Sequence, residues 1–260
     1  MIFEKPSLRT RVSFEVGMVQ LGGHALDLSA SVSLGGREAV YDVAKNLERM
    51  VQGIMIRTFG HDRVERMAEF ASVPVINGLT DYSHPCQGMA DYLTMLEVKG
   101  RLEGLTVAYV GDSNNVTHSL MFGAALLGVH LRVGSPAGYQ PDAGALAWVA
   151  AEAPKSGASI EIYDDPVRAV RDADVVYTDT WTSMGQEQEA ARRREIFQPY
   201  QVNASLMAHA KPDAIFMHCL PAHRNEEVTD EVIDSAQSVV FQQAENRLHI
   251  QKALLFALMR

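Results

Sequence analysis

Short apolar runs alternate with helical segments along this chain, and this alternation is the feature that most constrains the fold. The strand-like runs cover residues 24–28, 53–57, 73–76, 105–110, 131–133, 159–163, 175–178, 214–218 and 238–241. The first helical segments between them cover residues 7–21, 38–50, 61–71 and 89–98. A strand–helix–strand repeat makes successive strands parallel and covers both faces of a sheet with helices. We therefore predict an α/β fold with two doubly wound parallel-sheet domains.

A polar stretch at Lys99–Gly104 interrupts the alternation, and we place the domain boundary there. The predicted domains are residues 1–100 and 101–245, because 260 residues suffice for two ordinary domains. A last helical stretch at 248–259 either ends the second domain or crosses back to the first. We assign residues 246–260 to a C-terminal helix that packs back on the first domain.

Charge and cysteine content limit the classes of partner. A net charge of −9 argues against nucleic acid, and the most apolar run, residues 120–133, contains His130 and two glycines, which argues against a membrane span. Cys86 and Cys219 do not have the spacing of a disulfide framework. The cysteine pattern predicts a cytoplasmic protein. The arginines at residues 9 and 11 form a local cationic spot in an acidic chain, which predicts a small anion as the ligand.

The sequence Ser7-Leu8-Arg9-Thr10-Arg11 opens a segment in which Val12, Val16 and Val19 recur with helical spacing. Ser7 is suited to cap this helix, and the first-turn N–H groups together with the helix dipole favour an anion such as phosphate. Arg9 adds a guanidinium fork. The alternative is an ordinary capped amphipathic helix with solvated arginines.

Two further segments of the first domain carry polar groups at strand ends. Arg57 ends an apolar strand, at the edge where open α/β sheets bind ligands, although a lone arginine there is usually part of a surface ion pair. His84 can donate to a carbonyl oxygen, and Gln87 can hold a carbamoyl or amide group. Taken alone, these two residues are better interpreted as a turn histidine and a helix-capping glutamine.

The second domain places polar side chains after three strands. Gly111-Asp112-Ser113-Asn114-Asn115 lacks the glycines of a dinucleotide-binding turn, so we expect no nucleotide cofactor, and the two asparagines are either ligand amides or turn formers. Asp179 is suited to a cationic amine, and Ser183-Met184-Gly185 follows as a flexible segment that can close over a ligand. His218, Cys219 and His223 have no fourth ligand with zinc spacing, so we predict no metal. Cys219 can also be simply a buried small residue.

Together these segments resemble the aspartate/ornithine transcarbamoylase family, in its ornithine branch. The first motif matches at Ser7–Arg11, the second at His84–Gln87, and the ornithine-type motifs at Asp179, Ser183–Gly185 and His218–Pro221. Family members usually carry a helix and a strand before the first motif, so we expect a shortened chain. Leu8 replaces the usual threonine of the first motif. Ser33-Leu34-Gly35-Gly36-Arg37-Glu38 differs from the segment that often donates a glutamine to a neighbouring subunit.

The resemblance implies attack of the neutral side-chain amine of ornithine on carbamoyl phosphate, giving citrulline and phosphate without metal or cofactor. It assigns Arg57, His84, Cys219 and Arg247 as catalytic. It assigns to carbamoyl-phosphate binding Ser7, Leu8, Arg9, Thr10, Arg57, His84, Gln87, Cys219, Leu220 and Arg247. It assigns to ornithine binding Asn115, Asp179, Ser183 and Met184. It further implies a homotrimer, or a multiple of one, formed through the first domain.

Three alternatives stay open at this point. A related transcarbamoylase could act on another amine such as putrescine, since only the second domain selects the acceptor. An aspartate-specific enzyme would need additional basic residues. A non-catalytic paralogue could retain the fold alone. The direction of the reaction, biosynthetic or catabolic, does not follow from the sequence.

Overall fold

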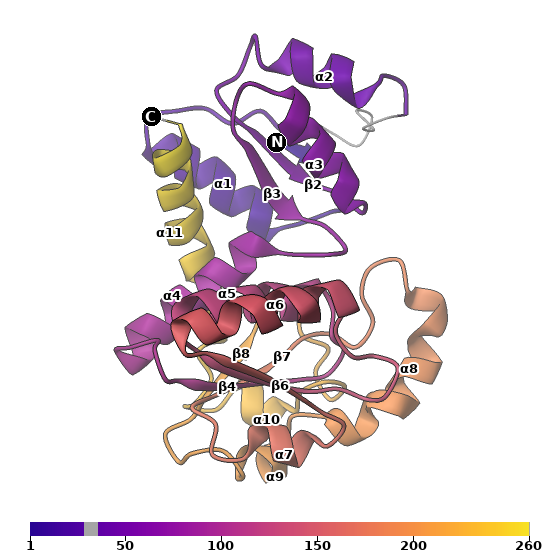
Figure 1. The fold of residues 1–260 in the computed structure, drawn as a ribbon, viewed down its shortest axis with the longest axis vertical. Helices are drawn as coiled ribbons and strands as arrows, with labels where there is room; N and C mark the ends of the chain where they lie inside the picture. Colours follow the sequence, from indigo (N-terminus) through magenta and orange to yellow (C-terminus); the bar gives the residue numbers. More distant parts are fainter. Residues whose placement is uncertain (29–35, 260) are drawn as a thin grey trace. The chain divides into compact units, whose positions relative to one another are not determined.

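The computed structural model describes residues 1–28 and 36–259, which form two compact units (Figure 1). Unit 1 combines Met1–Ala90 with Glu245–Arg260, and unit 2 is Asp91–Ala244. The chain passes between the units inside two helices, α4 (Pro85–Lys99) and α11 (Val240–Leu258). The polar stretch after Lys99 thus marks the end of α4, ten residues beyond the change of unit.

Unit 1 is built on a small parallel sheet. Strands β1 (Ile2–Phe3), β2 (Ile54–Arg57) and β3 (Val75–Leu79) lie in that order. Arg57 is in register with Phe3 on one side and with Leu79 on the other, after a register shift at Ile56/Arg57. The loops that follow all three strands therefore begin at the same edge of the sheet.

Helices cover both faces of this sheet, because alternate strand residues point to opposite sides. Ile54 and Ile56 share a buried cluster with residues of α2 (Val40–Leu47) and α3 (His61–Phe70). Met55 shares another with Phe14 of α1 (Arg9–Gln20) and with residues of α4 and α11. Full burial of a side chain such as Phe14 contributes about 1.5–3 kcal/mol. Unit 1 is thus doubly wound, as predicted.

The buried face of α1 differs from the face expected. Val12, Val16 and Val19 are between 37% and 61% exposed, whereas the buried residues of the helix are Thr10, Ser13, Phe14 and Gly17. Gly17 faces α11, since a Cβ there would lie 3.7–3.8 Å from Lys252, Leu248 and Leu255. Hydrogen bonds from α11 satisfy the buried hydroxyls of α1, so a polar face can be packed here without penalty.

Unit 2 is a five-stranded parallel sheet of order β6-β5-β4-β7-β8. Its strands are β4 (Thr106–Val110), β5 (His130–Gly134), β6 (Ser159–Tyr163), β7 (Val175–Thr178) and β8 (Ile215–His218). The chain adds β5 and β6 on one side of β4 and then returns to add β7 and β8 on the other. The point between β4 and β7 is where sheets of this kind bind ligands.

Helices also cover both faces of the second sheet (Figure 1). On one side lie α5 (Asn115–Leu127) and α6 (Ala143–Ser156), which pack with Val107 and Tyr109. The other side holds α7 (Pro166–Val170), α8 (Ala190–Phe197), α9 (Ala204–Met207) and α10 (Asp230–Ile233). Two 3₁₀ turns, η1 (Glu187–Glu189) and η2 (Gln198–Tyr200), flank α8.

Side-chain caps explain where several helices of unit 2 begin. Asn114, Asp142, Asp165 and Asn203 each accept a hydrogen bond from a first-turn N–H of the helix that follows. Such caps stabilise a helix by about 1 kcal/mol each. Local sequence therefore determines the residues at which these helices begin.

Two predicted strands are wrong. Among residues 24–28 only Leu28 pairs, through an isolated bridge to Ile2, and residues 238–241 contribute one bridge from Ser238 to Phe216. α11 begins at Val240, so the apolar residues that follow Ser238 form a helical turn. Short apolar runs do not distinguish strand from buried helix. Ser33, Leu34 and Gly35, which belong to the segment compared above with the family's subunit-contact segment, lie outside the described residues, as does the rest of 29–35.

Across residues 1–28 and 36–259, no helix is long and apolar enough to cross a membrane.

Candidate active site

The first part of the candidate site is the N-terminus of α1. The helix begins at Arg9, and the Ser7 hydroxyl accepts the Thr10 N–H at 3.2 Å, so Ser7 acts as the expected cap. Leu8 is 72% exposed and its side chain makes no capping hydrogen bond. The first turn therefore offers backbone N–H groups and the positive end of the helix dipole, which suits an anion.

Arg57 lies at the carboxyl edge of the sheet of unit 1 and is 7% exposed. This burial is incompatible with the surface ion pair considered from the sequence. A guanidinium held at this depth, beside the loops after β1 and β3, is placed to meet a ligand at the sheet edge.

Lys5 joins these loops, and sequence reasoning missed it. It is 4% exposed, forms an ion pair with Asp81 of the loop after β3, and lies with Nζ 4.3 Å from the ring centre of Phe59 in the loop after β2. In the sequence, Lys5 is a charged residue between a strand and a helix cap. A solvated side chain is the simpler interpretation of such a position.

His84 precedes α4 and is 5% exposed. Its carbonyl accepts the N–H groups of Gln87 and Gly88 at 3.0 and 3.1 Å. Burial lowers the pKa of His84 well below its usual value, and the charges of Arg247, Arg57 and Arg9 lower it further. The imidazole is therefore neutral near pH 7. The shift also shows that the charges of all three arginines reach His84.

Arg247 of α11 is the centre of a buried hydrogen-bond network and is 2% exposed. Its Nη1 donates to Gln87 Oε1 at 2.7 Å, its Nη2 to Thr10 Oγ1 at 3.0 Å, and its Nε to Gln251 Oε1 at 2.8 Å. The network fixes the guanidinium before any ligand arrives. It also occupies the Gln87 carbonyl oxygen, which orients the amide of Gln87.

Cys86, next to these residues in sequence, is fully buried and donates to the Asn77 carbonyl at 3.4 Å. Burial raises the pKa of its thiol to about 11. It packs in the core of unit 1 and is not nucleophilic at neutral pH.

In unit 2, three loops meet at Asp179, which follows β7 at the switch point and is 8% exposed. Asn114 Nδ2 donates to Asp179 Oδ2 at 2.6 Å, and Cys219 Sγ to Asp179 Oδ1 at 2.9 Å. Thr180 N–H donates to the same carboxylate at 2.8 Å. A carboxylate with this support is held in one orientation, as recognition of an ammonium group requires.

The two asparagines after β4 have separate functions. Asn114 caps α5, by accepting the Val116 N–H at 2.9 Å, and its amide also contacts Asp179. Asn115 is the first residue of α5, and its carbonyl accepts the Ser119 hydroxyl at 2.9 Å.

Ser183 and Met184 lie in a turn that is held by hydrogen bonds between Ser183 and Gln186. Ser183 N–H donates to Gln186 Oε1 at 3.2 Å, and Gln186 N–H donates back to the Ser183 carbonyl at 3.0 Å. Gly185 has φ = +95°, a conformation that side chains disfavour, and Met184 is 40% exposed. The turn thus presents a flexible apolar side chain to solvent.

A buried ion pair, Asp112–Arg193, lies behind this turn, and sequence reasoning missed it. Arg193 Nη2 is 2.8 Å from Asp112 Oδ2, and the two residues are 3% and 7% exposed. Burial raises the pKa of Asp112 to about 6, against the opposing effect of Arg193. Arg193 lies in an arginine run, Arg192-Arg193-Arg194, that gives no sequence signal for burial.

His218 supports the loop that carries Cys219 and Leu220. It is fully buried, its Nδ1 accepts the Leu220 N–H at 2.9 Å, and its Nε2 lies 3.1 Å from Glu227 Oε1. Leu220 has φ = +56° and precedes a cis bond to Pro221. These contacts hold the Cys219 thiol beside Asp179.

Donor atoms in two groups lie close enough to suggest metal ligands, namely Asp179, His218 and Cys219, and His223, Glu226 and Glu227. In the first group both ring nitrogens of His218 already take part in hydrogen bonds. In the second, Glu226 pairs with Arg194 at 2.8 Å. Neither group resembles a preformed metal site.

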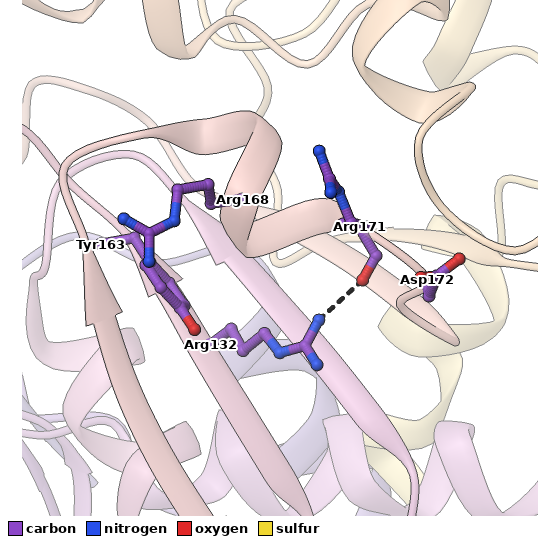
Figure 2. A pocket seen from close by; sticks show the side chains of 5 residues that line it. All are labelled: Arg132, Tyr163, Arg168, Arg171 and Asp172. Carbon is purple, nitrogen blue, oxygen red and sulfur yellow. Dashed lines mark hydrogen bonds between the residues drawn. The ribbon is translucent and has the colours of Figure 1, made fainter.

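A pocket of about 420 Å³ in unit 2 involves none of the predicted site residues. It is lined by Arg132, Tyr163, Arg168, Arg171 and Asp172. Figure 2 shows Arg168 against the Tyr163 ring and Arg132 donating to the Arg171 carbonyl, at 2.6 Å. The guanidinium groups of Arg132 and Arg168 therefore already have partners within the pocket wall.

Comparison with known proteins gives the family to which these two units belong. Residues 1–97 match the family model of the carbamoyl-P binding domain of aspartate/ornithine carbamoyltransferase. Residues 103–258 match the model of its Asp/Orn binding domain. The chain belongs to the aspartate/ornithine carbamoyltransferase family.

Similar proteins within the family share one name. An ornithine carbamoyltransferase of Thermococcus kodakarensis is 60% identical over the whole chain, which covers 82% of that relative. An anabolic ornithine carbamoyltransferase of Pyrococcus furiosus is 58% identical with the same coverage. The solved structure of ornithine carbamoyltransferase from Pyrococcus furiosus superposes with a TM-score of 0.97, covering all of this chain and 83% of that one. The structure from Thermus thermophilus, 48% identical, gives 0.90 and covers all of this chain and 85% of that one.

Proposed function

We propose that the chain transfers the carbamoyl group of carbamoyl phosphate to the side-chain amine of L-ornithine, which gives L-citrulline and phosphate. The observation that carries this proposal is that three arginines act on one buried histidine, His84. The charges of Arg9, Arg57 and Arg247 all help to lower its pKa. These residues occur in a chain 60% identical to an ornithine carbamoyltransferase. A relative named as anabolic supports the biosynthetic direction.

The proposed reaction needs no covalent enzyme intermediate. The lone pair of the neutral amine attacks the carbonyl carbon, and the C–O bond to phosphate breaks from the tetrahedral intermediate. The phosphate leaves with the bonding electron pair, and the attacking nitrogen loses one proton. Catalysis then consists of binding the anion, stabilising the oxyanion and orienting the amine.

The proposed carbamoyl-phosphate residues of unit 1 divide by chemistry. Ser7, the Leu8 backbone, Arg9, Thr10 and Arg57 bind the phosphate, which carries about two negative charges near neutral pH. The neutral His84 ring and Arg247 donate to the carbamoyl oxygen, and Gln87 orients the carbamoyl nitrogen. The fixed geometry of Arg247 supports this assignment, because preorganised donors stabilise a developing oxyanion without reorganisation.

The proposed acceptor residues of unit 2 are Asn115, Asp179, Ser183 and Met184. Asp179 receives the α-amino group of ornithine, and the Ser183–Met184 turn covers the bound amino acid. Cys219 and the Leu220 backbone belong to the carbamoyl-phosphate set, where they surround the carbamoyl group near the reacting amine. The hydrogen bond between Cys219 and Asp179 supports a joint function in orienting the acceptor.

A citrulline-formation assay with ornithine and putrescine in parallel tests the proposal. Citrulline is expected with ornithine, together with stoichiometric phosphate. Carbamoylputrescine as the main product would assign a different amine acceptor. No product with either amine, from a folded chain, would favour a non-catalytic member of the family.

We further propose that the active form is a cytoplasmic homotrimer or a multiple of it. An exposed apolar row supports association, since Leu8, just before α1, and Val12, Val16 and Val19 on α1 are 72%, 50%, 37% and 61% exposed. The two free cysteines support a reducing compartment. Light scattering should give a multiple of three 28.6 kDa chains, and an active monomer would refute the assembly. Cell fractionation tests the location.

A further inference from the structure

A buried arginine lies directly behind the turn that contains Ser183 and Met184. Arg193 of α8 is 3% exposed, and its Nη2 donates to Asp112 Oδ2 at 2.8 Å and to Gln186 Oε1 at 3.0 Å. Gln186 Oε1 also accepts the Ser183 N–H at 3.2 Å. One glutamine oxygen therefore joins the turn to the guanidinium.

The guanidinium itself is held on several sides. Its central carbon lies 4.9 Å from the ring centre of Tyr139 and 5.7 Å from that of Phe197. Phe197 stacks in turn on Trp181, with ring centres 6.0 Å apart. Trp181 lies two residues before Ser183, so Arg193 is fixed by the same aromatic group that anchors the start of the turn.

Asp112 links this group to the proposed acceptor site. It belongs to the loop after β4 that also contains Asn114, whose amide donates to Asp179 at 2.6 Å. Arg193 thus connects the loop that orients Asp179 with the turn that contains Ser183. The connection runs entirely through residues of unit 2.

The hydrogen-bonding state of Arg193 argues for more than packing. Nε and Nη1 of Arg193 are buried and have no hydrogen-bond partner among the described residues, which costs stability. An apolar side chain between the two rings would avoid that cost. In contrast, the bond to the exposed Gln186 adds little to the core, but it orders the turn.

We propose that Arg193 is a positioning residue which, through Gln186, holds the Ser183–Met184 turn in the conformation that receives the amino-acid acceptor. This inference rests on the proposed function, since it takes that turn as part of the acceptor site. Asp112 and the aromatic pair fix Arg193, and Gln186 transmits its position to the backbone of Ser183.

The test compares three variants of the full chain. Gln186→Ala removes the shared oxygen, Gln186→Glu keeps an oxygen in the same place, and Gln188→Ala truncates an exposed glutamine two positions away. In Gln186→Ala the KM for ornithine should rise about three- to tenfold with a smaller change in kcat, as loss of one hydrogen bond implies. The KM for carbamoyl phosphate should not change. Gln186→Glu and Gln188→Ala should resemble the parent chain.

A wild-type KM for ornithine in Gln186→Ala, or an equal rise in Gln188→Ala, would overturn the inference. Arg193→Lys keeps the charge but not the planar fork, so it should raise the same KM further, and its thermal unfolding shows whether it folds.

Hydrogen exchange separates this inference from the proposed function, because it requires no turnover. The Ser183 amide should exchange faster in Gln186→Ala than in Gln186→Glu, with no change in the strands of unit 2. Equal exchange in both variants would refute the positioning contact. Failure of the parent chain to form citrulline would instead refute the proposed function.

Discussion

The two units place opposite charges at the carboxyl edges of their sheets. In unit 1, the guanidinium groups of Arg9, Arg57 and Arg247 lower the pKa of a buried histidine. In unit 2, burial raises the pKa of Asp112 to about 6, and the nearby Asp179 carboxylate contributes to the increase. The net charge of −9 for the whole chain does not indicate the local charge at either sheet edge. Local fields, and not the total charge, distinguish a site for a phosphate from a site for an amine.

The two edges also differ in rigidity. Thr10, Arg57, His84, Gln87 and Arg247 of unit 1 are each less than 8% exposed, and a hydrogen-bond network joins several of them. Unit 2 combines a buried carboxylate with an exposed turn. The cluster around Arg247 is therefore fixed before any ligand binds, whereas the exposed turn of unit 2 can adjust.

The largest effect is expected from Arg57→Ala. Loss of a buried charged contact costs about 2–5 kcal/mol, which corresponds to roughly 30-fold to several thousand-fold in kcat/KM for carbamoyl phosphate. Steady-state citrulline formation measures it, with the exposed Arg66→Ala as the matched control. Near-parental activity of a folded Arg57→Ala chain would remove the arginine cluster from the proposed site.

A smaller effect, confined to the acceptor, is expected from Asp179→Asn. The substitution keeps the shape but removes the charge that pairs with an ammonium group, so the KM for ornithine should rise by about tenfold or more. Binding of carbamoyl phosphate, measured by calorimetry, should not change. Asp164→Asn is the control, since its side chain is exposed. A loss of carbamoyl-phosphate binding in Asp179→Asn would contradict the proposal that unit 1 binds carbamoyl phosphate and unit 2 binds the amine acceptor.

The smallest effect concerns stability against pH, where the two units should show opposite signs. His84 takes up a proton in the unfolded chain near pH 6.5 but not in the folded one, so its contribution to the free energy of unfolding is lost as pH falls below about 6.5. Asp112 retains its proton in the folded chain up to about pH 6, so its contribution is lost as pH rises from its usual 3.8 to about 6.

Denaturant titrations at pH 4–7 distinguish the two contributions. His84→Gln should flatten the fall in stability towards acid, by up to about 1.4 kcal/mol per pH unit, and Asp112→Asn should remove the opposing contribution. His24→Gln, at an exposed position, serves as the control. The same change of slope in both variants would show that the two fields do not differ in sign.

Much of the fold could be predicted from local pattern. The strand at 175–178 lies where predicted, because a fully buried parallel strand leaves a continuous apolar signal. The edge strand at 159–163 also lies where predicted, although it is only partly buried and its apolar residues alternate with polar ones. The apolar face of α1 was misread, since its partner α11 presents Arg247 and Gln251, far away in sequence, and these favour buried hydroxyls over valines.

The candidate site shows the same limit. The residues at strand ends, Arg57, Asp179 and Cys219, could be selected from sequence because a strand end has a defined place in the sheet. The contacts that orient them could not, as Lys5, Gln186 and Arg193 are ordinary polar residues until tertiary structure buries or pairs them. Sequence pattern gives the position of a site residue but not what holds it.

Unit 1 is built from two separate segments of the chain, and this determines the order in which the two units can fold during translation. Thr10 finds its partner Arg247 only 237 positions later, and all of unit 2 is synthesised in between. At about 5–20 residues per second, the first segment waits roughly ten to thirty seconds on the ribosome without α11. Over that time the polar face of α1 stays hydrated while the contiguous unit 2 can already fold. The hydrogen-bond cluster around Arg247 is therefore assembled only after unit 2 has been synthesised, and a nascent chain lacks these contacts until α11 has left the ribosome.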